Sequence, residues 1–317
     1  MKKVRGLAIV VAALFLVFPF CPQSEAANKN YSIVSAAPGG NWYTMVGAAT
    51  GLYTKKIPGA NFTIAGTGGS VENARRFVAG EADFGPIYSS NLYEMYNATG
   101  AAKGRPKSDA AQVMFQIYDS PHYFVTLKKS GIKTIKDLQG KKVALGAPGS
   151  GTTQNSRLVF NTLEMKVNGV ELSFGDAARQ LQDGKIDALG QGGAPASGIV
   201  ELAATQEIVI IPFNNEELDK IIAVAPYYFK GQLKPGTYRG QEAAVPAFSV
   251  AVFFAAHKSM PEDLVYQVMK ATFEPESLSY LAKAHPEWKN AMNHPEAVKQ
   301  LGVKYHPGAA KYWAEKK

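Results

Sequence analysis

The chain has 317 residues, of which 46% are hydrophobic, and it carries a formal net charge of +8. This composition is typical of a folded globular protein and excludes a disordered or low-complexity chain. The basic residues are scattered, with no run longer than two, so we interpret the charge as a solvated surface and expect no nucleic-acid partner.

The first 26 residues predict a secretory signal peptide. Three basic residues among the first five precede an apolar run from 7 to 20, and small residues follow near Ser24-Glu25-Ala26. The apolar run is shorter than the ~20 residues that a membrane-spanning helix needs. We therefore expect cleavage after Ala26 and a periplasmic protein. An uncleaved anchor and a lipoprotein modified at Cys21 are the alternatives, although the residues before Cys21, Phe18-Pro19-Phe20, are bulky for that processing.

Cleavage at this position would remove the only cysteine, Cys21. The mature chain would then have no disulfide, no thiolate nucleophile and no cysteine-bound metal. Loss of three basic residues and one acidic residue lowers the net charge from +8 to +6. About 290 residues remain, which is enough for two domains of ordinary size.

Strands, loops and helices alternate along the chain. In a first unit we expect strands at 31–36, 61–65 and 83–87 and helices at 42–56 and 70–78, with Ser70 as a helix N-cap. The pattern restarts with strands at 143–146 and 186–189 and helices at 152–165 and 174–183. Exposed loops are expected at 100–108 and 232–240, a buried strand within 243–256, and mainly helices from Pro261. This alternation predicts an α/β fold with mostly parallel strands and helices on both faces.

Five loops follow predicted strands, at 38–43, 66–73, 88–91, 148–154 and 191–194. Ligands of open parallel sheets bind at the carboxyl ends of the strands, and a glycine-rich helix start offers free N–H donors. Gly68-Gly69-Ser70 and Ser150-Gly151-Thr152 could therefore hold a carboxylate or phosphate, with plain helix capping as the alternative. The candidate ligand-binding residues are Asn41, Trp42, Tyr43, Thr67, Gly68, Gly69, Ser70, Asn73, Tyr88, Ser89, Ser150, Gly151, Thr152, Thr153, Gln154, Gln191 and Gly193.

Nucleotide-binding and hydrolase motifs are incomplete. The Walker A spacing that starts at Gly146 has Thr152 where lysine is required, and Val71 replaces the third glycine of a dinucleotide-binding loop. Ala147 replaces the first glycine of a nucleophile elbow around Ser150.

The sequence also has no motif for metal binding or for acid–base catalysis. The five histidines have no metal-ligand spacing, and we expect His285 and His294 at the surface. Asp83 and Asp187 each end a Gly-x-x-Asp turn into a strand, so we interpret both as structural. We expect no catalytic residue, no metal and no cofactor.

The glycine loops belong to an ordered set of short motifs. The set comprises Gly66-Thr67-Gly68-Gly69-Ser70-Val71-Glu72-Asn73, Gly80-Glu81-Ala82-Asp83, Ser130-Gly131-Ile132-Lys133, Asp137-Leu138-Gln139-Gly140-Lys141-Lys142-Val143, Pro148-Gly149-Ser150-Gly151-Thr152, Asp183-Gly184-Lys185-Ile186-Asp187-Ala188, Pro235-Gly236-Thr237-Tyr238, and His306-Pro307-Gly308-Ala309 with Tyr312 and Glu315. In this order, over nearly all of the mature chain, they resemble the TAXI family, the solute receptors of one class of TRAP transporters.

The resemblance implies a type II periplasmic-binding fold, with two α/β lobes joined by a two-segment hinge. We place the crossovers near 118–124 and 245–250. Lobe one would hold residues 27–120 plus 248–317, lobe two would hold 121–247, and the five loops would line the cleft between them. Three cleft positions depart from the family, one of which is the unusually glycine-rich loop Gln191-Gly192-Gly193-Ala194-Pro195. The first loop reads Ala37-Pro38-Gly39-Gly40-Asn41-Trp42-Tyr43-Thr44 where the family usually has Thr-Gly-Gly-x-Tyr-Tyr-Pro, and Ser90 stands where an aspartate is frequent.

The resemblance also implies a function without catalysis. Family members bind amino acids such as glutamate and glutamine, or small organic acids, and deliver them to TRAP membrane subunits. Arg75 and Arg157 lie near helix starts, but no cleft arginine is evident, so we hypothesise a carboxylate held by backbone N–H and hydroxyl donors. We expect a monomer. The alternatives are a ligand-sensing subunit of a membrane receptor kinase, and a secreted enzyme on the same fold.

Overall fold

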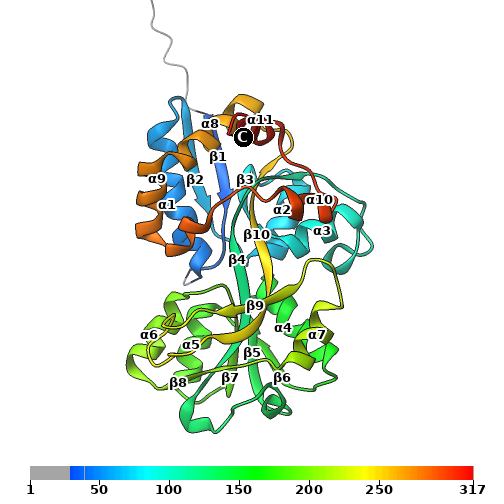
Figure 1. The fold of residues 1–317 in the computed structure, drawn as a ribbon, viewed down its shortest axis with the longest axis vertical. Coiled ribbons are helices and arrows are strands. Elements are labelled where there is room, and N and C mark those ends of the chain that lie inside the picture. Colours follow the sequence, from blue (N-terminus) through cyan, green and yellow to red (C-terminus); the bar gives the residue numbers. More distant parts are fainter. Residues whose placement is uncertain (1–28, 39, 317) are drawn as a thin grey trace, which may run out of the picture.

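The structure is a computed structural model that describes residues 29–38 and 40–316. The predicted signal peptide and Gly39 lie outside the described residues. The chain forms two α/β lobes, one above the other in Figure 1, which two long strands connect. The predicted two-lobed α/β fold with a two-segment hinge is confirmed. Within the described part, no helix has the length and apolar character needed to cross a membrane.

The first lobe alternates strands and helices as the sequence predicts. Its elements are β1 (Lys29–Val34), α1 (Asn41–Lys56), β2 (Ala60–Ala65), α2 (Ser70–Ala79), β3 (Phe84–Tyr88) and α3 (Ser89–Asn97), followed by the 3-10 turn η1 (Gly100–Ala102). Strand β1 pairs in parallel with β2 and β3. The prediction that Ser70 is an N-cap is wrong. Gly69 occupies that position, and the Ser70 hydroxyl instead accepts a hydrogen bond from the Tyr88 backbone N–H at 2.8 Å.

Two long strands pass between the lobes, β4 (Ala111–Leu127) and β10 (Val245–His257). They pair with each other in antiparallel fashion, from Phe248 opposite His122 to His257 opposite Ala111. The expectation of a mostly parallel sheet therefore fails at the hinge. The resulting sheet has the order β2-β1-β3-β10-β4-β7-β5-β6, with β8 paired to β4 and β9 paired to β10.

The second lobe repeats the alternation. Its elements are β5 (Lys142–Gly146), α4 (Gly151–Thr162), β6 (Asn168–Glu171), α5 (Phe174–Gln182), β7 (Ala188–Gly192), α6 (Ser197–Thr205), β8 (Ile208–Ile211), α7 (Asn215–Ile222) and β9 (Phe229–Leu233), with short 3-10 turns at Lys128–Ser130 and Ile135–Leu138. The loop expected at 232–240 begins inside β9, because Gln232 and Leu233 pair with β10.

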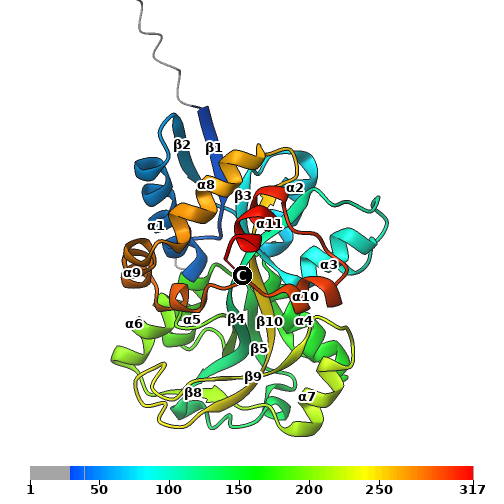
Figure 2. The same ribbon diagram turned by 45° about the horizontal axis from the view of Figure 1, so that its top comes forward.

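After β10 the chain returns to the first lobe as helices, as predicted from Pro261. These are α8 (Glu262–Phe273), α9 (Pro275–Ala284), the 3-10 turn η4 (Pro286–Asn290), α10 (Pro295–Gln300) and α11 (Pro307–Ala314). Figure 2 shows α8 beside α11 at the forward end of this lobe, with α9 beside α1. The C-terminal segment also lies along β4, where Met292 and Gln116 exchange backbone hydrogen bonds.

The two Gly-x-x-Asp aspartates have the predicted structural role. A side-chain oxygen of Asp83 accepts from the Ser32 backbone N–H, and one of Asp187 accepts from the Lys142 backbone N–H, each at 2.8 Å. Each carboxylate thereby fixes the start of a strand to its neighbour.

His122 is buried where β4 enters the second lobe. Its ring packs between Phe124 and Phe248, and its Nε2 lies 3.3 Å from the Ser156 hydroxyl. Its Nδ1 has no hydrogen-bond partner among the described residues. Burial in these apolar surroundings lowers the pKa of His122 to about 3, so the folded protein holds a neutral imidazole.

We expect His122 to destabilise the fold as the pH falls. The unfolded chain binds a proton at this side chain near pH 6.5, whereas the folded chain does not until about pH 3. Stability is thus retained above pH 6.5 and lost below it, by up to ~1.4 kcal/mol per pH unit for one proton. In urea unfolding, His122→Asn should lose less free energy of unfolding between pH 7 and pH 5 than the wild-type protein. Parallel curves for the two proteins would refute this role.

Candidate functional site between the lobes

The five predicted loops meet where the two lobes touch. A β-carbon added to Gly68 would overlap the carbonyl oxygen of Pro148 in the other lobe, so only glycine permits this approach. The Glu72 backbone N–H donates to the Gly149 carbonyl oxygen at 3.1 Å. The loops after β1, β2 and β3 therefore face those after β5 and β7, as predicted, and the lobes are closed on each other.

Tyr118, in β4, is the centre of the hydrogen bonds at this contact. Its hydroxyl accepts from Asn41 Nδ2 at 2.8 Å and from the indole Nε1 of Trp42 at 2.9 Å. Because two donors already point at this oxygen, the Tyr118 hydrogen is free for a third partner. Burial raises the Tyr118 pKa well above its usual value, so the hydroxyl remains protonated.

Tyr88 extends this network into the second lobe. Its hydroxyl lies 3.1 Å from the Ser120 hydroxyl, and the Tyr88 hydroxyl and Thr152 Oγ1, at the start of α4, both approach Gly192. Its ring meets Trp42 edge-on, with ring centroids 5.1 Å apart. A β-carbon at Gly192 would overlap the Tyr88 hydroxyl. We call these contacting residues the cross-lobe cluster; its members are all buried and uncharged and comprise Asn41, Trp42, Tyr88, Tyr118, Ser120, Thr152, Gly192 and Gly193.

Several predicted residues support the loops through internal hydrogen bonds. Thr67 Oγ1 bonds the Ser35 carbonyl oxygen and Asn73 Oδ1. The Asn73 amide donates to the carbonyl oxygens of Ser35 and Pro86, both at 2.9 Å. These polar groups are saturated by the protein, so they hold the loop after β2 against β1 and β3.

At the start of α4, Ser150 caps the helix, which is the alternative to anion binding that the sequence offered. The Ser150 hydroxyl accepts from the Thr153 backbone N–H at 3.0 Å, and Thr153 Oγ1 donates to the Ala147 carbonyl oxygen at 2.8 Å. Gly69 and Gly151 contribute close backbone approach in the same region, next to Ser150 and Tyr88 respectively.

Three further residues predicted to bind the ligand, Tyr43, Gln191 and Gln154, differ in exposure and in hydrogen-bond partners. Tyr43 is 37% exposed, and no hydrogen bond among the described residues joins it to the cluster. Gln191 is buried, and its amide donates to the Gly192 carbonyl oxygen. Gln154 bonds to Asn91 and Glu94, away from the cluster.

Two serine hydroxyls lie buried at the start of α3. Ser89 and Ser90 follow Tyr88 directly and are at most 1% exposed, yet neither Oγ has a hydrogen-bond partner among the described residues. Buried polar groups are normally bonded. These hydroxyls, with the free N–H groups of the helix start, are therefore unused donors directly after Tyr88 of the cross-lobe cluster.

Sequence reasoning missed Tyr118 and Ser120. The crossover predicted near 118–124 includes both residues, but no hinge side chain was assigned to the site. A tyrosine and a serine two residues apart on a strand project from one face. Polar groups on one face of a crossover strand are the signal that could have identified them.

The expected surface position of His285 is also wrong. It is 6% exposed, and its Nε2 lies 3.3 Å from the Pro195 carbonyl oxygen in the second lobe. The turn η4 that follows α9 brings this end of the first lobe down onto the loop before α6. His294 instead caps α10, where its Nδ1 accepts from the Ala297 backbone N–H.

A solvent-connected cavity of about 570 Å³ lies next to the cluster, between β9, β4 and η4. We call it the hinge-side cleft. Its lining combines apolar side chains with charged groups of both signs and includes Tyr118, Asp119, Lys230, Lys234, Glu287 and Lys289. Its volume suits a small ligand, so it is a second candidate location for one.

The sequence model of the NMT1-like family matches residues 33–316, which is nearly the whole chain. The chain belongs to the NMT1-like family. This NMT1-like protein is also similar to solved structures of periplasmic binding proteins. It shares 17% identity and a TM-score of 0.51 with an ancestral arginine-binding protein bound to arginine, over 82% of this chain and 97% of that one.

Two further structures show the same likeness. MatC from Rhodopseudomonas palustris, with bound malate, shares 15% identity and a TM-score of 0.53, over 90% of this chain and 96% of MatC. A periplasmic transporter structure shares 13% identity and a TM-score of 0.54, over 91% of this chain and 96% of that one. At these identities the likeness shows that this NMT1-like protein has the periplasmic-binding-protein fold.

Tyr118→Phe should destabilise the unliganded protein. The substitution leaves two buried donors, Asn41 Nδ2 and Trp42 Nε1, without their acceptor, which should cost about 1–3 kcal/mol in urea unfolding. Tyr43→Phe is the matched control, because that side chain is exposed, and its effect should stay within about 0.5 kcal/mol. Equal effects of the two substitutions would contradict the central place of Tyr118.

Proposed function

We propose that the protein is an extracytoplasmic solute-binding receptor. It captures a small polar ligand that carries a carboxylate, an amino acid such as glutamate or glutamine or a small organic acid, between its two lobes. It then delivers this ligand to a TRAP-type membrane transporter and catalyses no reaction. Membership of the NMT1-like family and the periplasmic-binding fold support the receptor role. The ordered TAXI-like motifs and the signal-peptide pattern support the transporter and the periplasmic location.

The observation that carries this proposal is the pair of unused hydroxyls, Ser89 and Ser90, beside an uncharged cluster to which both lobes contribute. Helices α3 and α4 both begin there, and helix N-termini favour anions through their free N–H groups. Hydrogen bonds to a carboxylate are stronger than those between neutral groups. An anionic group can thus be bound without an arginine.

Closure about the hinge provides the working cycle. We propose residues 27–120 plus 248–317 as one lobe and 121–247 as the other. Ligand contacts from both lobes exist together only in the closed state, so a ligand shifts the population towards it. The closed surface is then the form that the transporter recognises. The proteins of the same fold with bound arginine and malate carry ligands that each contain a carboxylate.

Thermal unfolding against a panel of amino acids, dicarboxylates and sugars tests the proposal. A ligand present at ~100 times its dissociation constant adds about 2.7 kcal/mol of stability, which is a shift of several degrees. We expect an amino acid or a dicarboxylate to stabilise the protein and the sugars to have no effect. A sugar-only response, or no response at all, would overturn the proposed ligand class.

Ser89→Ala/Ser90→Ala should weaken binding without harming the fold. The two hydroxyls have no internal partner to lose, so unliganded stability should be unchanged, while affinity for the stabilising compound should fall about tenfold or more. Ser277→Ala is the matched control, since its buried Oγ in α9 is also unpartnered among the described residues. Isothermal titration calorimetry measures the effect. If affinity falls with Lys289→Ala instead, the ligand occupies the hinge-side cleft.

A further inference from the structure

Glu94, in α3 of the first lobe, is only 2% exposed, and its two oxygens have different partners. Oε2 accepts from the Ala101 backbone N–H at 3.1 Å and from Asn91 Nδ2 at 3.2 Å, both in the first lobe. Oε1 accepts from Gln154 Nε2 at 2.6 Å and from the Tyr227 hydroxyl at 3.2 Å, both in the second lobe. One carboxylate thus connects the two lobes.

The neighbours of Glu94 strengthen this connection. Gln154 Oε1 accepts from Asn91 Nδ2 at 2.6 Å, so the Gln154 amide is bonded to the first lobe through both of its polar atoms. Tyr227, between α7 and β9, also packs against Tyr93 of α3, with ring centroids 5.4 Å apart. Buried hydrogen bonds and an aromatic contact therefore cross between the lobes here, away from the cross-lobe cluster.

The backbone that surrounds the Glu94 carboxylate belongs to the first lobe. The turn η1 wraps around it so closely that a β-carbon on Gly100 would overlap the carboxylate. When the lobes separate, Glu94 therefore stays with α3 and η1. Only Oε1 loses its partners, and water replaces them.

We infer that Glu94, with Gln154 and Tyr227, forms a latch that holds the lobes closed before any ligand arrives. The inference rests on the proposed function, because it requires lobes that open and close. Glu94 is a positioning residue in this role: it acts on the closed state and not on the ligand. The position of Gln154, expected in the binding site, is explained by the same contact.

The latch would set ligand affinity indirectly. A ligand that binds only the closed form has an apparent dissociation constant equal to the intrinsic value divided by the fraction of closed protein. Loss of one hydrogen bond to a charged group changes an equilibrium by about tenfold or more. Removing one cross-lobe bond should therefore shift the unliganded protein measurably towards the open form.

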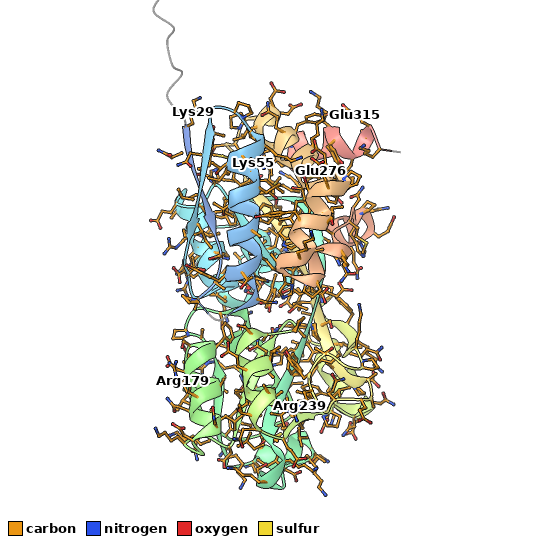
Figure 3. All side chains as sticks on the ribbon, turned by 90° about the vertical axis from the view of Figure 1, so that its left-hand side faces the viewer. Lys29, Lys55, Arg179, Arg239, Glu276 and Glu315 are labelled. Atoms are coloured by element: carbon orange, nitrogen blue, oxygen red, sulfur yellow. The ribbon has the colours of Figure 1, made fainter. Side chains whose placement is uncertain are left out.

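Distance measurements between two spin labels test the latch without any ligand. Lys55 in α1 and Arg179 in α5 are exposed, lie in different lobes and are visible on the same side of the molecule in Figure 3. Labels at Lys55→Cys and Arg179→Cys, in a Cys21→Ser background of the full chain, should give a short-distance population for the closed form. Tyr227→Phe removes one hydroxyl and should move a substantial part of that population to longer distances.

Tyr93→Phe is the matched control, because it alters the neighbouring ring of the same aromatic pair without touching Glu94. It should leave the distance distribution unchanged. Glu94→Gln provides a second variant: it places an NH2 group among donors and should open the lobes further. Circular dichroism melting checks that each variant folds. Distributions for Tyr227→Phe and Glu94→Gln that superimpose on the background would overturn the latch.

Failure of the latch and failure of the proposed function are distinguishable. The labels report closure in the absence of any compound, whereas the unfolding panel reports binding. If the variants open but no compound of the panel stabilises the protein, the latch stands and the proposed ligand class falls. If a compound of the panel stabilises the protein and the variants stay closed, the proposed ligand class stands and the latch falls.

Discussion

The antiparallel pairing of β4 and β10 is the constraint on which the rest of the structure depends. These strands run side by side from Ala111 opposite His257 to His122 opposite Phe248, and each carries elements of both lobes on its outer edges. Strand β3 extends the ladder in the first lobe, while β7, β8 and β9 extend it in the second. Backbone hydrogen bonds along this ladder fix the two lobes laterally, so bending of the strands between the lobes is the motion that remains available.

The chemistry of the contact between the lobes follows from its position at this hinge. A surface that alternates between water and the protein interior must tolerate both, and charged groups are expensive to desolvate without full pairing. Hydroxyls, amides and glycine backbone satisfy this requirement because each can exchange a protein partner for water at modest cost. Tyr118, Tyr88, Thr152 and Asn41 are such groups. Glu94 is a charged group at this contact, and the four donors around it match the full pairing that a buried carboxylate needs.

Sequence reasoning located the elements and loops well, because their signals are local. Glycine in the left-handed conformation ends α2 at Gly80, and alternating strands and helices mark both lobes. It could not find contacts that form only in three dimensions. Ser70 has the residue type of a helix cap, yet its hydroxyl is used by Tyr88 of another strand. His285 lies in a polar, proline-flanked segment and is nevertheless buried, because η4 presses it against Pro195 of the second lobe. Tyr118 and Ser120 lack any motif, and only the crossing of the hinge strand past both lobes makes them central.

In the proposed receptor, the contacts that hold the two lobes together would influence the affinity for the ligand. A protein that is mostly open pays for closure out of the ligand's binding free energy, which weakens binding by the fraction of closed protein. A protein held closed too firmly would instead slow ligand entry, since the cluster is buried when the lobes meet. The contacts around Glu94 are few, their donors are neutral, and opening hydrates the carboxylate. The strength of this contact can therefore change through Gln154 or Tyr227 without altering any group of the cross-lobe cluster, so affinity and ligand selectivity can vary independently.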